Sequence, residues 1–427
     1  MMRAGKEIEN RLFFLDNLRL FLVLCVVLEH SSHAYTSMTW WPVSDAAKSN
    51  IAVWLSAFTD AFAMPILFYI AGYFAIPSIR KKGVWAFYIG KIKRLGIPWL
   101  VCILAICPIV PLVFHYTRNN FSFAVSYWQL WRDIMRNAFQ FDVGIIYSMS
   151  ELMRQNLFYQ RYMWFLSLLL LFFLFFGIFY ATNSSWFKPM TDSEPMDGPN
   201  TRFSLKIPIS VGALTVVCSF ATVGAMFSLA PGLSNPEPLF TFGNIIQFRP
   251  SRLFFFIIYF ILGILTFKHK WIERGTFPGH FRTWLIAFLI STAAFFYARH
   301  LMLNGPESLE KIFGASFFLA LNFVSISVLG LSISLGLRYW NQPTGITQKL
   351  ATSSYNIYLA HYLFVIVFQL VLLAVPGFPG LFKFGMVAGS SIFCSYLFSQ
   401  FIIKPRPKIA VSLAAGLFVI MVMVVRP

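Results

Sequence analysis

The sequence predicts an all-α polytopic membrane protein, a bundle of about ten core transmembrane helices plus one extra C-terminal helix. Of the 427 residues, 58% are hydrophobic and only 12% are charged, whereas a typical soluble domain has about 25% charged residues. The length would allow two or three soluble domains, but no polar stretch is long enough to form one. We therefore expect nearly all of the chain to lie in or against a lipid bilayer.

Apolar stretches long enough to cross a bilayer recur along the whole chain. We expect residues 1–403 to form the core domain and residues 404–427 the additional helix. The first stretch has a basic start, as a signal peptide does, but ionisable residues interrupt its apolar run, so we expect an uncleaved span. The eleven predicted spans are 14–36, 51–77, 96–116, 162–182, 208–230, 251–267, 283–303, 313–337, 352–374, 383–403 and 409–425.

The net charge of +18 encodes membrane topology rather than nucleic-acid binding. Most of the 34 Lys and Arg residues fall on alternate connections between the spans. The positive-inside rule then places the N-terminus in the cytoplasm and, after eleven crossings, the C-terminus outside. The five cysteines all lie in apolar stretches without CxxC spacing, so we expect neither a disulfide framework nor a zinc site, and we assign no metal ligands.

Two connections are long. Residues 117–161 carry aromatic and mixed-charge residues and face outward in this topology, which suits amphipathic helices that lie on the membrane or cover a site. Residues 183–207 include TDSEPMDGPN and are expected to form a flexible cytoplasmic linker.

Ionisable residues inside the first span are the strongest functional signal in the sequence. Hydrocarbon does not solvate a charge, so such residues are functional-site hypotheses by default. Arg19 and His30 are eleven positions apart, or about 16 Å of helical rise, which puts Arg19 near the cytoplasmic surface and His30 beyond the midplane. Asp16 lies beside Arg19 on the helix, and Glu29 directly precedes His30.

Asp60 in the second span lies at a depth similar to that of His30. A carboxylate bonded to one ring nitrogen would fix the tautomer of the histidine and raise the basicity of the other nitrogen. We therefore predict a contact between Asp60 and His30.

These residues also have simpler interpretations. His33 lies nearer the interface and fits an interfacial or hydrogen-bonded role. Arg19 can extend its charge to the cytoplasmic headgroups, and the basic clusters between spans usually encode topology. Polar side chains within spans, such as Asp60 and Gln369, can simply bond helices together.

Four motifs in a fixed order resemble the membrane-bound acyltransferase-3 family, and most of all its glucan biosynthesis protein C-like branch. They extend from residue 11 to residue 361, so the resemblance covers most of the chain. The motifs are LDNLR with Arg19-x10-His30, FYIAGYF followed by basic residues, MWFLSLLLL at 163–171, and SSYNIYLAH at 353–361.

The resemblance implies a bundle of about ten helices in the cytoplasmic (inner) membrane of a bacterium. It implies an O-acyltransferase that takes an acyl group from cytoplasmic acyl-CoA, either acetyl-CoA or succinyl-CoA. The acceptor would be a hydroxyl of an extracytoplasmic glycan or another envelope carbohydrate. The expected partners are therefore membrane lipids, acyl-CoA and this glycan acceptor, with no nucleic acid.

The family's site residues map onto particular positions of this sequence. Its Arg-x10-His pair corresponds to Arg19 and His30, and the basic residue after its GYF segment corresponds to Arg80. Its YLxH stretch, rich in tyrosine, corresponds to Tyr355, Tyr358 and His361.

The chain departs from the family pattern in two ways. The WFL element follows Arg161-Tyr162-Met163 instead of the usual His-Leu, and an eleventh span follows the ten-helix core. In fused relatives such a span leads to a hydrolase-like domain. Here the sequence ends at residue 427, so we expect any such glycan-assembly module to be a separate protein.

The chemistry of acyl transfer fits these residues. A neutral His30 can take the proton of a hydroxyl near pH 7, acting as a base or as an acylated carrier. His361 is a second candidate for positioning or proton transfer. Cations at the cytoplasmic face would hold the phosphates of CoA, and the expected ones are Arg19, Arg80, Lys81 and Arg94.

Two other functional classes compete with the enzyme. A proton-coupled transporter or a flippase for a glycan precursor would use Arg19, Glu29, His30 and Asp60 as a proton relay. A membrane scaffold for a glycan-assembly complex leaves the buried Arg19 unexplained.

Overall fold

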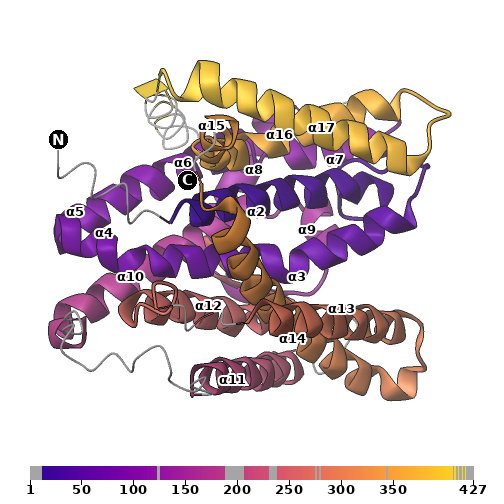
Figure 1. Cartoon of the computed structure of the whole chain (residues 1–427). Helices are drawn as coiled ribbons and strands as arrows, with labels where there is room; N and C mark the ends of the chain where they lie inside the picture. The colour runs from indigo at the N-terminus through magenta and orange to yellow at the C-terminus, as the bar shows by residue number, and fades with distance from the viewer. Residues whose placement is uncertain are drawn as a thin grey trace.

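The structure is a computed structural model in which long helices lie side by side in one bundle (Figure 1). It describes residues 12–122, 126–187, 206–229, 238–274, 277, 280–342 and 345–406, together with 408, 409, 412, 416 and 419. We call the end of the bundle that holds Phe13 the inner end and the end that holds His33 the outer end. These names follow the orientation predicted from charge, which stays a prediction.

The long helices match the predicted spans closely. Eight helical stretches in the described residues are long and apolar enough to cross a membrane. The first predicted span is α2 (Phe13–Ser32) and the fifth is α11 (Lys206–Leu229). The others are α3 (Asn50–Tyr73) with α4 (Ala75–Lys82), α5 (Val84–Lys91) with α6 (Ile97–Ala105) and α7 (Ile109–Arg118), α10 (Trp164–Thr182), α12 (Pro250–Lys268), α13 (Phe281–Asn304), α14 (Glu310–Leu335), α16 (Ser354–Leu373) and α17 (Gly380–Phe398).

The predicted start of the third span was wrong. The helical stretch begins at Val84 rather than at residue 96, and a π-helical turn at Ile92–Gly96 continues it past the basic residues. Those residues suggested a connection, but the ammonium of Lys91 lies 3.5 Å from the centre of the Phe173 ring, where a cation–π contact stabilises it. A break then separates α6 from α7 at Pro108, which lacks the N–H that would continue the helix.

Most residues of the eleventh predicted span, 409–425, lie outside the described residues. The same holds for most of the predicted linker at 183–207, of which Ser184–Phe187 form a short 3-10 helix. The division of the chain at residue 403 also stays a prediction.

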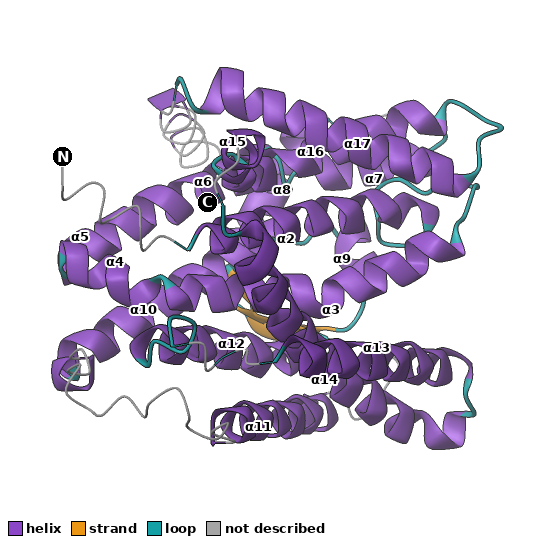
Figure 2. Cartoon of the chain, in the orientation of Figure 1, coloured by secondary structure: helices purple, strands orange, loops and turns teal. Residues whose placement is uncertain are grey.

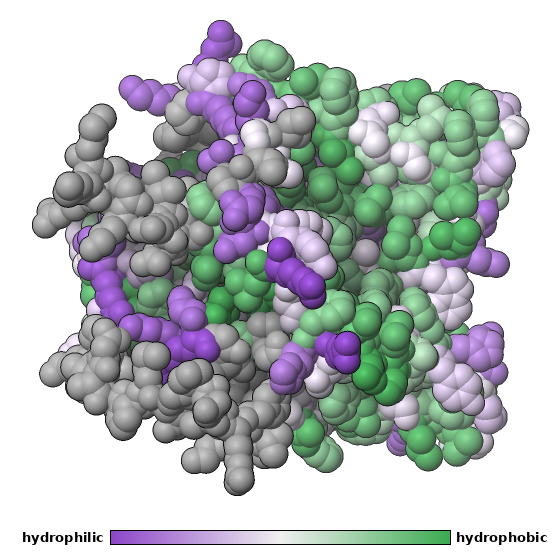
Figure 3. Space-filling model, viewed as in Figure 1, coloured by the Kyte–Doolittle hydropathy of each residue, from purple (hydrophilic) through white to green (hydrophobic). Residues whose placement is uncertain are grey.

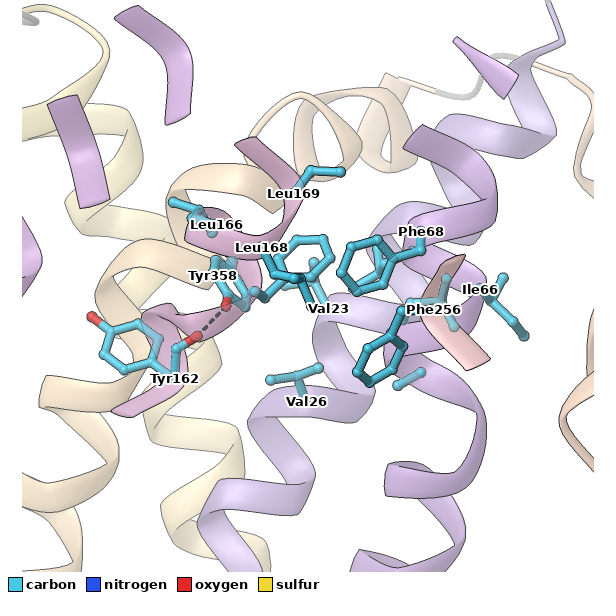
Figure 4. Packing of buried hydrophobic residues seen from close by; sticks show 14 of the residues in the cluster. Val23, Val26, Ile66, Phe68, Tyr162, Leu166, Leu168, Leu169, Phe256 and Tyr358 are labelled. Atoms are coloured by element: carbon cyan, nitrogen blue, oxygen red, sulfur yellow. Dashed lines mark hydrogen bonds between the residues drawn. The ribbon is translucent and has the colours of Figure 1, made fainter. Parts of the chain in front are cut away.

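Close helix packing builds the core around α3 and α12. A Cβ atom added to Gly72 would lie 2.0 Å from the carbonyl oxygen of Phe260, and one added to Gly263 would lie 2.1 Å from that of Tyr69. Small residues let membrane helices approach in this way. Figure 4 shows Phe68 of α3 and Phe256 of α12 in this core, with ring centroids 4.9 Å apart.

The outer end carries elements that the sequence did not predict. The segment 117–161 contains the amphipathic helix α8 (Tyr127–Phe139), as expected, and the short α9 (Met149–Arg154). It also contains β1 (Val143–Ile146), which pairs antiparallel with β2 (Leu239–Phe242), and β2 pairs with β3 (Ile246–Phe248). These strands lie behind the helices in Figure 2.

The surface agrees with a membrane protein. Apolar side chains cover most of the right half of the face seen in Figure 3, and hydrophilic ones lie over its left half and centre and along the right edge. Large apolar side chains on α13 and α17, such as Ile290 and Phe393, are exposed. In water such a surface would aggregate, whereas lipid chains solvate it.

Candidate active site

A cavity of about 820 Å³ opens at the outer end of the bundle. Its wall is formed by the last turn of α2, the N-terminal half of α3, the start of α10 and α12, and the loop after α2. Three predicted site residues, Glu29, His30 and Asp60, line it together. The imidazole of His30 therefore faces the interior of the bundle and not the lipid.

His30 bonds to the other histidine that the sequence singled out. Its Nδ1 lies 2.9 Å from Nε2 of His361 on α16, and the two rings are nearly parallel with centroids 5.2 Å apart. His361 is fully buried, and its Nδ1 lies 2.7 Å from the carbonyl oxygen of Tyr358. The two histidines thus form a chain that begins at the backbone of α16.

The chain of hydrogen bonds fixes both tautomers. A carbonyl oxygen only accepts, so Nδ1 of His361 must carry the proton that it donates to Tyr358. In the neutral ring Nε2 then accepts, and Nδ1 of His30 donates to it. This assignment leaves Nε2 of His30 with a free lone pair, which is the arrangement that a general base requires.

Aromatic side chains hold the His30 ring in place. Trp41 stacks on it at 5.8 Å, and Tyr362 meets it edge-on at 5.1 Å. Gln369 of α16 accepts from the indole N–H of Trp41 at 2.8 Å and donates to the backbone oxygens of His30 and Ser31. Gln369 thus links α16 to α2 beside His30, in agreement with the helix-bonding role that the sequence analysis allowed for it.

The predicted contact between Asp60 and His30 was wrong. Asp60 lines the same cavity, but its carboxylate accepts from Arg252 of α12 at 2.9 Å. Asp60 and His30 line the same cavity because they lie at similar depths. Their hydrogen-bond partners differ because each helix is rotated about its axis so that the two side chains face different neighbours. His361, 331 residues away from His30, occupies the place expected for Asp60.

Glu29, His30 and His33 form a cluster at the end of α2. One ligand atom from each residue lies within 4.8 Å of the others, so the group could hold a metal ion. We assigned no metal ligands from the cysteine spacing, which carries no information about these three residues. The ring of His33 also approaches the hydroxyl of Ser56 at 3.4 Å.

The loop between α2 and α3, residues 36–49, is tied down beside the cavity. Lys383 of α17 forms a buried ion pair of 2.7 Å with Asp45. Lys48 donates to the backbone oxygen of Thr36 at 2.7 Å. Burial lowers the pKa of Lys48, and the nearby carboxylate of Asp45 acts in the opposite direction. The loop thus presents Trp40 and Trp41 to the cavity from a fixed position.

A second cavity, of about 340 Å³, lies at the inner end. Arg19 and Arg94 line it with Asp16 and Tyr355, and Arg19 pairs with Asp16 at 3.2 Å. The structure thus brings together two of the four cations expected to hold CoA.

The other two expected cations, Arg80 and Lys81, are exposed on α4 and do not line this inner cavity. The guanidinium of Arg80 donates to the backbone oxygen of Phe187 instead.

α16 connects the two cavities. Tyr355 lines the inner cavity and Tyr362 the outer one, and Tyr358 and His361 lie between them on the same helix. The hydroxyl of Tyr358 donates to the backbone oxygen of Tyr162, as the dashed line in Figure 4 shows. The two cavities share no lining residue in the described part of the chain, and the buried Tyr358 lies between Tyr355 and Tyr362 on α16.

Sequence reasoning did not assign Arg161, Arg252 or Tyr162 to the site. Arg161 and Tyr162 form a short 3-10 helix (Arg161–Met163) at the start of α10 and line the outer cavity with Arg252. The departure of Arg161-Tyr162 from the family pattern was the one available signal. It marked the position without showing what the residues contact.

Comparisons with known proteins agree with the motifs. A family model described as an acyltransferase domain matches residues 12–424. Glucans biosynthesis protein C of Escherichia coli strain SMS-3-5 is 25% identical over 265 residues, which cover 60% of this chain and 58% of that protein. The proteins of the same name from strains K12 and 536 are 24% and 26% identical over the same share. The match thus spans less than two thirds of these relatives, and no solved structure matches the chain.

Proposed function

This chain belongs to the acyltransferase-3 family, and from that premise we propose that it is an integral membrane O-acyltransferase. It would transfer an acetyl or succinyl group from acyl-CoA at the inner end to a hydroxyl of an envelope glycan at the outer end. Since the relatives are named for the biosynthesis of glucans, a glucan is the first acceptor to test. The N-terminus would be cytoplasmic, in the inner membrane of a bacterium.

The observation that carries this proposal is that one helix, α2, contributes to both cavities. Arg19 lines the inner cavity and His30 lines the outer one. The helical rise between them is about 16 Å, and a pantetheine arm can bridge a gap of this order. Arg19 and Arg94 would hold CoA phosphates, because guanidinium groups bind phosphate oxygens in pairs.

The proposed reaction needs one base. Nε2 of His30 accepts the proton of the acceptor hydroxyl while the hydroxyl oxygen attacks the thioester carbonyl carbon. The carbon–sulfur bond then breaks, and the leaving CoA sulfur takes the proton from His30, so that the products are an ester and a free thiol. The carboxylate of Glu29, within 4.8 Å of the ring, would stabilise the transient imidazolium.

Replacing His30 by Ala tests this function. We expect the variant to insert in the membrane but to release no CoA thiol above background when purified protein, acetyl- or succinyl-CoA and a glucan are mixed. His300→Ala, which changes an exposed histidine on α13, serves as the control and should keep full activity. Glycan acylation at the wild-type rate in His30→Ala would refute the role of His30. A stable acyl adduct on His30 would make it a covalent carrier instead.

A transporter or flippase is the second candidate. Two cavities at opposite ends of the bundle, with no lining residue in common among the described residues, are also what alternating access requires. Such a protein moves its substrate without cleaving a thioester. The absence of thiol release from the wild-type protein, together with movement of a labelled glycan precursor into vesicles, would favour this function over the enzyme.

A further inference from the structure

Arg161 is a buried cation in the outer cavity whose guanidinium meets no carboxylate among the described residues. Its side chain lines the cavity, yet the residue is only 4% exposed. The hydrogen bond that the structure gives this group runs from Nη1 to Sδ of Met153, at 2.6 Å, and Nε makes no hydrogen bond. The guanidinium also lies 5.0 Å from the centre of the Tyr159 ring, a cation–π contact that offers no hydrogen-bond acceptor. Buried arginines are normally paired, because an isolated charge loses its hydration.

The backbone holds this guanidinium in place at some cost. Arg161 has a φ of +55°, in the left-handed region that residues with a side chain rarely adopt. Two hydrogen bonds of the neighbouring Gln160 hold this turn in place. Its backbone N–H donates to Oε1 of Gln247 at 3.1 Å, and its side-chain amide donates to the backbone oxygen of Ile245. Strained residues of this kind concentrate at ligand sites.

The charge of the cavity favours an anion. Of the charged side chains that line it, four are arginines and two are carboxylates. One of those carboxylates, Asp60, already pairs with Arg252. A negative group entering the cavity would therefore meet an excess of positive charge.

Arg161 also lies next to the reacting histidines. The adjacent Tyr162 has its ring 5.3 Å from His361 and 4.5 Å from Tyr362, which in turn contacts His30 at 5.1 Å. A negative group bound by Arg161 would thus sit within the same aromatic frame as the base.

We propose that Arg161 binds a carboxylate of the ligand in the outer cavity. Nε and Nη2 lie on one edge of the guanidinium, the edge that a carboxylate engages with two parallel hydrogen bonds. The carboxylate belongs either to a dicarboxylic acyl group or to an acidic sugar of the acceptor. The inference rests on the proposed function for the identity of these two ligands.

Ligand binding tests the inference without turnover. Binding of small ligands is measured by titration in detergent. The proteins compared are the wild type, Arg161→Gln, Arg161→Lys and a control, Arg136→Gln, which changes an exposed arginine of α8. The acyl arm uses monomethyl succinate against dimethyl succinate, and the sugar arm uses glucuronate against glucose. We expect wild type to prefer the acid in one arm. Arg161→Gln should lose at least about tenfold in affinity for that acid, as one charge-assisted pair is worth.

Each outcome decides a separate question. Arg161→Lys keeps the positive charge and should retain part of the preference for the acid, which would show that Arg161→Gln loses affinity through the missing charge and not through misfolding. Arg136→Gln should bind as wild type does. Equal binding of acid and neutral probes by the wild type in both arms would overturn the inference, as would unchanged acid binding by Arg161→Gln. Preserved acid binding in a protein that releases no CoA thiol would refute the proposed function alone.

Discussion

His361 determines which nitrogen of His30 carries a proton. Its own tautomer is set by the carbonyl oxygen of Tyr358, and it accepts from Nδ1 of His30. In the proposed reaction, this neutral acceptor would orient the ring of the base as the carboxylate of a Ser-His-Asp triad orients its histidine. It adds no charge to the interior of a membrane protein, where a carboxylate would be costly.

Removing this acceptor should impair the chemical step more than substrate binding. For His361→Ala we expect kcat to fall by about 100-fold, the scale of a displaced general base, with KM for acyl-CoA little changed. His361→Gln keeps an acceptor oxygen and should recover part of that loss. Steady-state kinetics of thiol release measure both. A rise in KM at unchanged kcat would contradict the positioning role.

The sequence identified both histidines but not their contact. The R-x10-H spacing and the YLxH stretch each pointed to one ring. The similar depths calculated for His30 and Asp60 led to the predicted contact between them. Helical rise gives the depth of a residue in the membrane but not the direction in which its side chain points. The contact between α2 and α16 depends on how the whole bundle assembles, which hydropathy does not encode.

α16 contributes to the lining of both cavities. Tyr355, Tyr358 and Tyr362 follow one another along the helix from the inner cavity to the outer one. In the proposed reaction the thioester must pass Tyr358, whose hydroxyl is bonded to Tyr162. Movement of this side chain would then be a step of the reaction cycle.

A larger side chain at this position should block transfer without affecting CoA binding. We expect Tyr358→Trp to bind CoA at the inner cavity as wild type does and to lose at least about tenfold in transfer rate, because Tyr358 is buried and a larger side chain overpacks its surroundings. Tyr297→Trp, on the exposed surface of α13, is the matched control. Calorimetry and thiol release separate the two effects, and an unaffected transfer rate would exclude this route.

Among the secondary-structure elements, the hydropathy of the sequence predicted the long membrane-spanning helices but not the short strands. Ten of the predicted spans correspond to described helices, since a bilayer requires about 20 apolar residues in a row. The strands β1 to β3 are only three or four residues long, and about 90 residues separate β1 from β2. No local pattern of that length predicts such pairing.

The whole bundle depends on the close approach of α3 and α12. We expect Gly263→Leu to destabilise the protein strongly, because its side chain would meet the backbone of Tyr69 and Tyr73, and overpacking of a core costs about 1–3 kcal/mol or more. Gly385→Leu on α17, where a Cβ meets no atom within 4 Å, should be tolerated. Thermal unfolding in detergent compares them. Equal melting temperatures would contradict the described packing.

The burial of Tyr358 between the two cavities has a consequence for the cell that would carry this protein. A membrane that stores energy as an ion gradient tolerates no permanent aqueous pore. In the proposed reaction the thioester would pass between buried aromatic side chains instead of through water, so transfer would leave the proton-motive force intact.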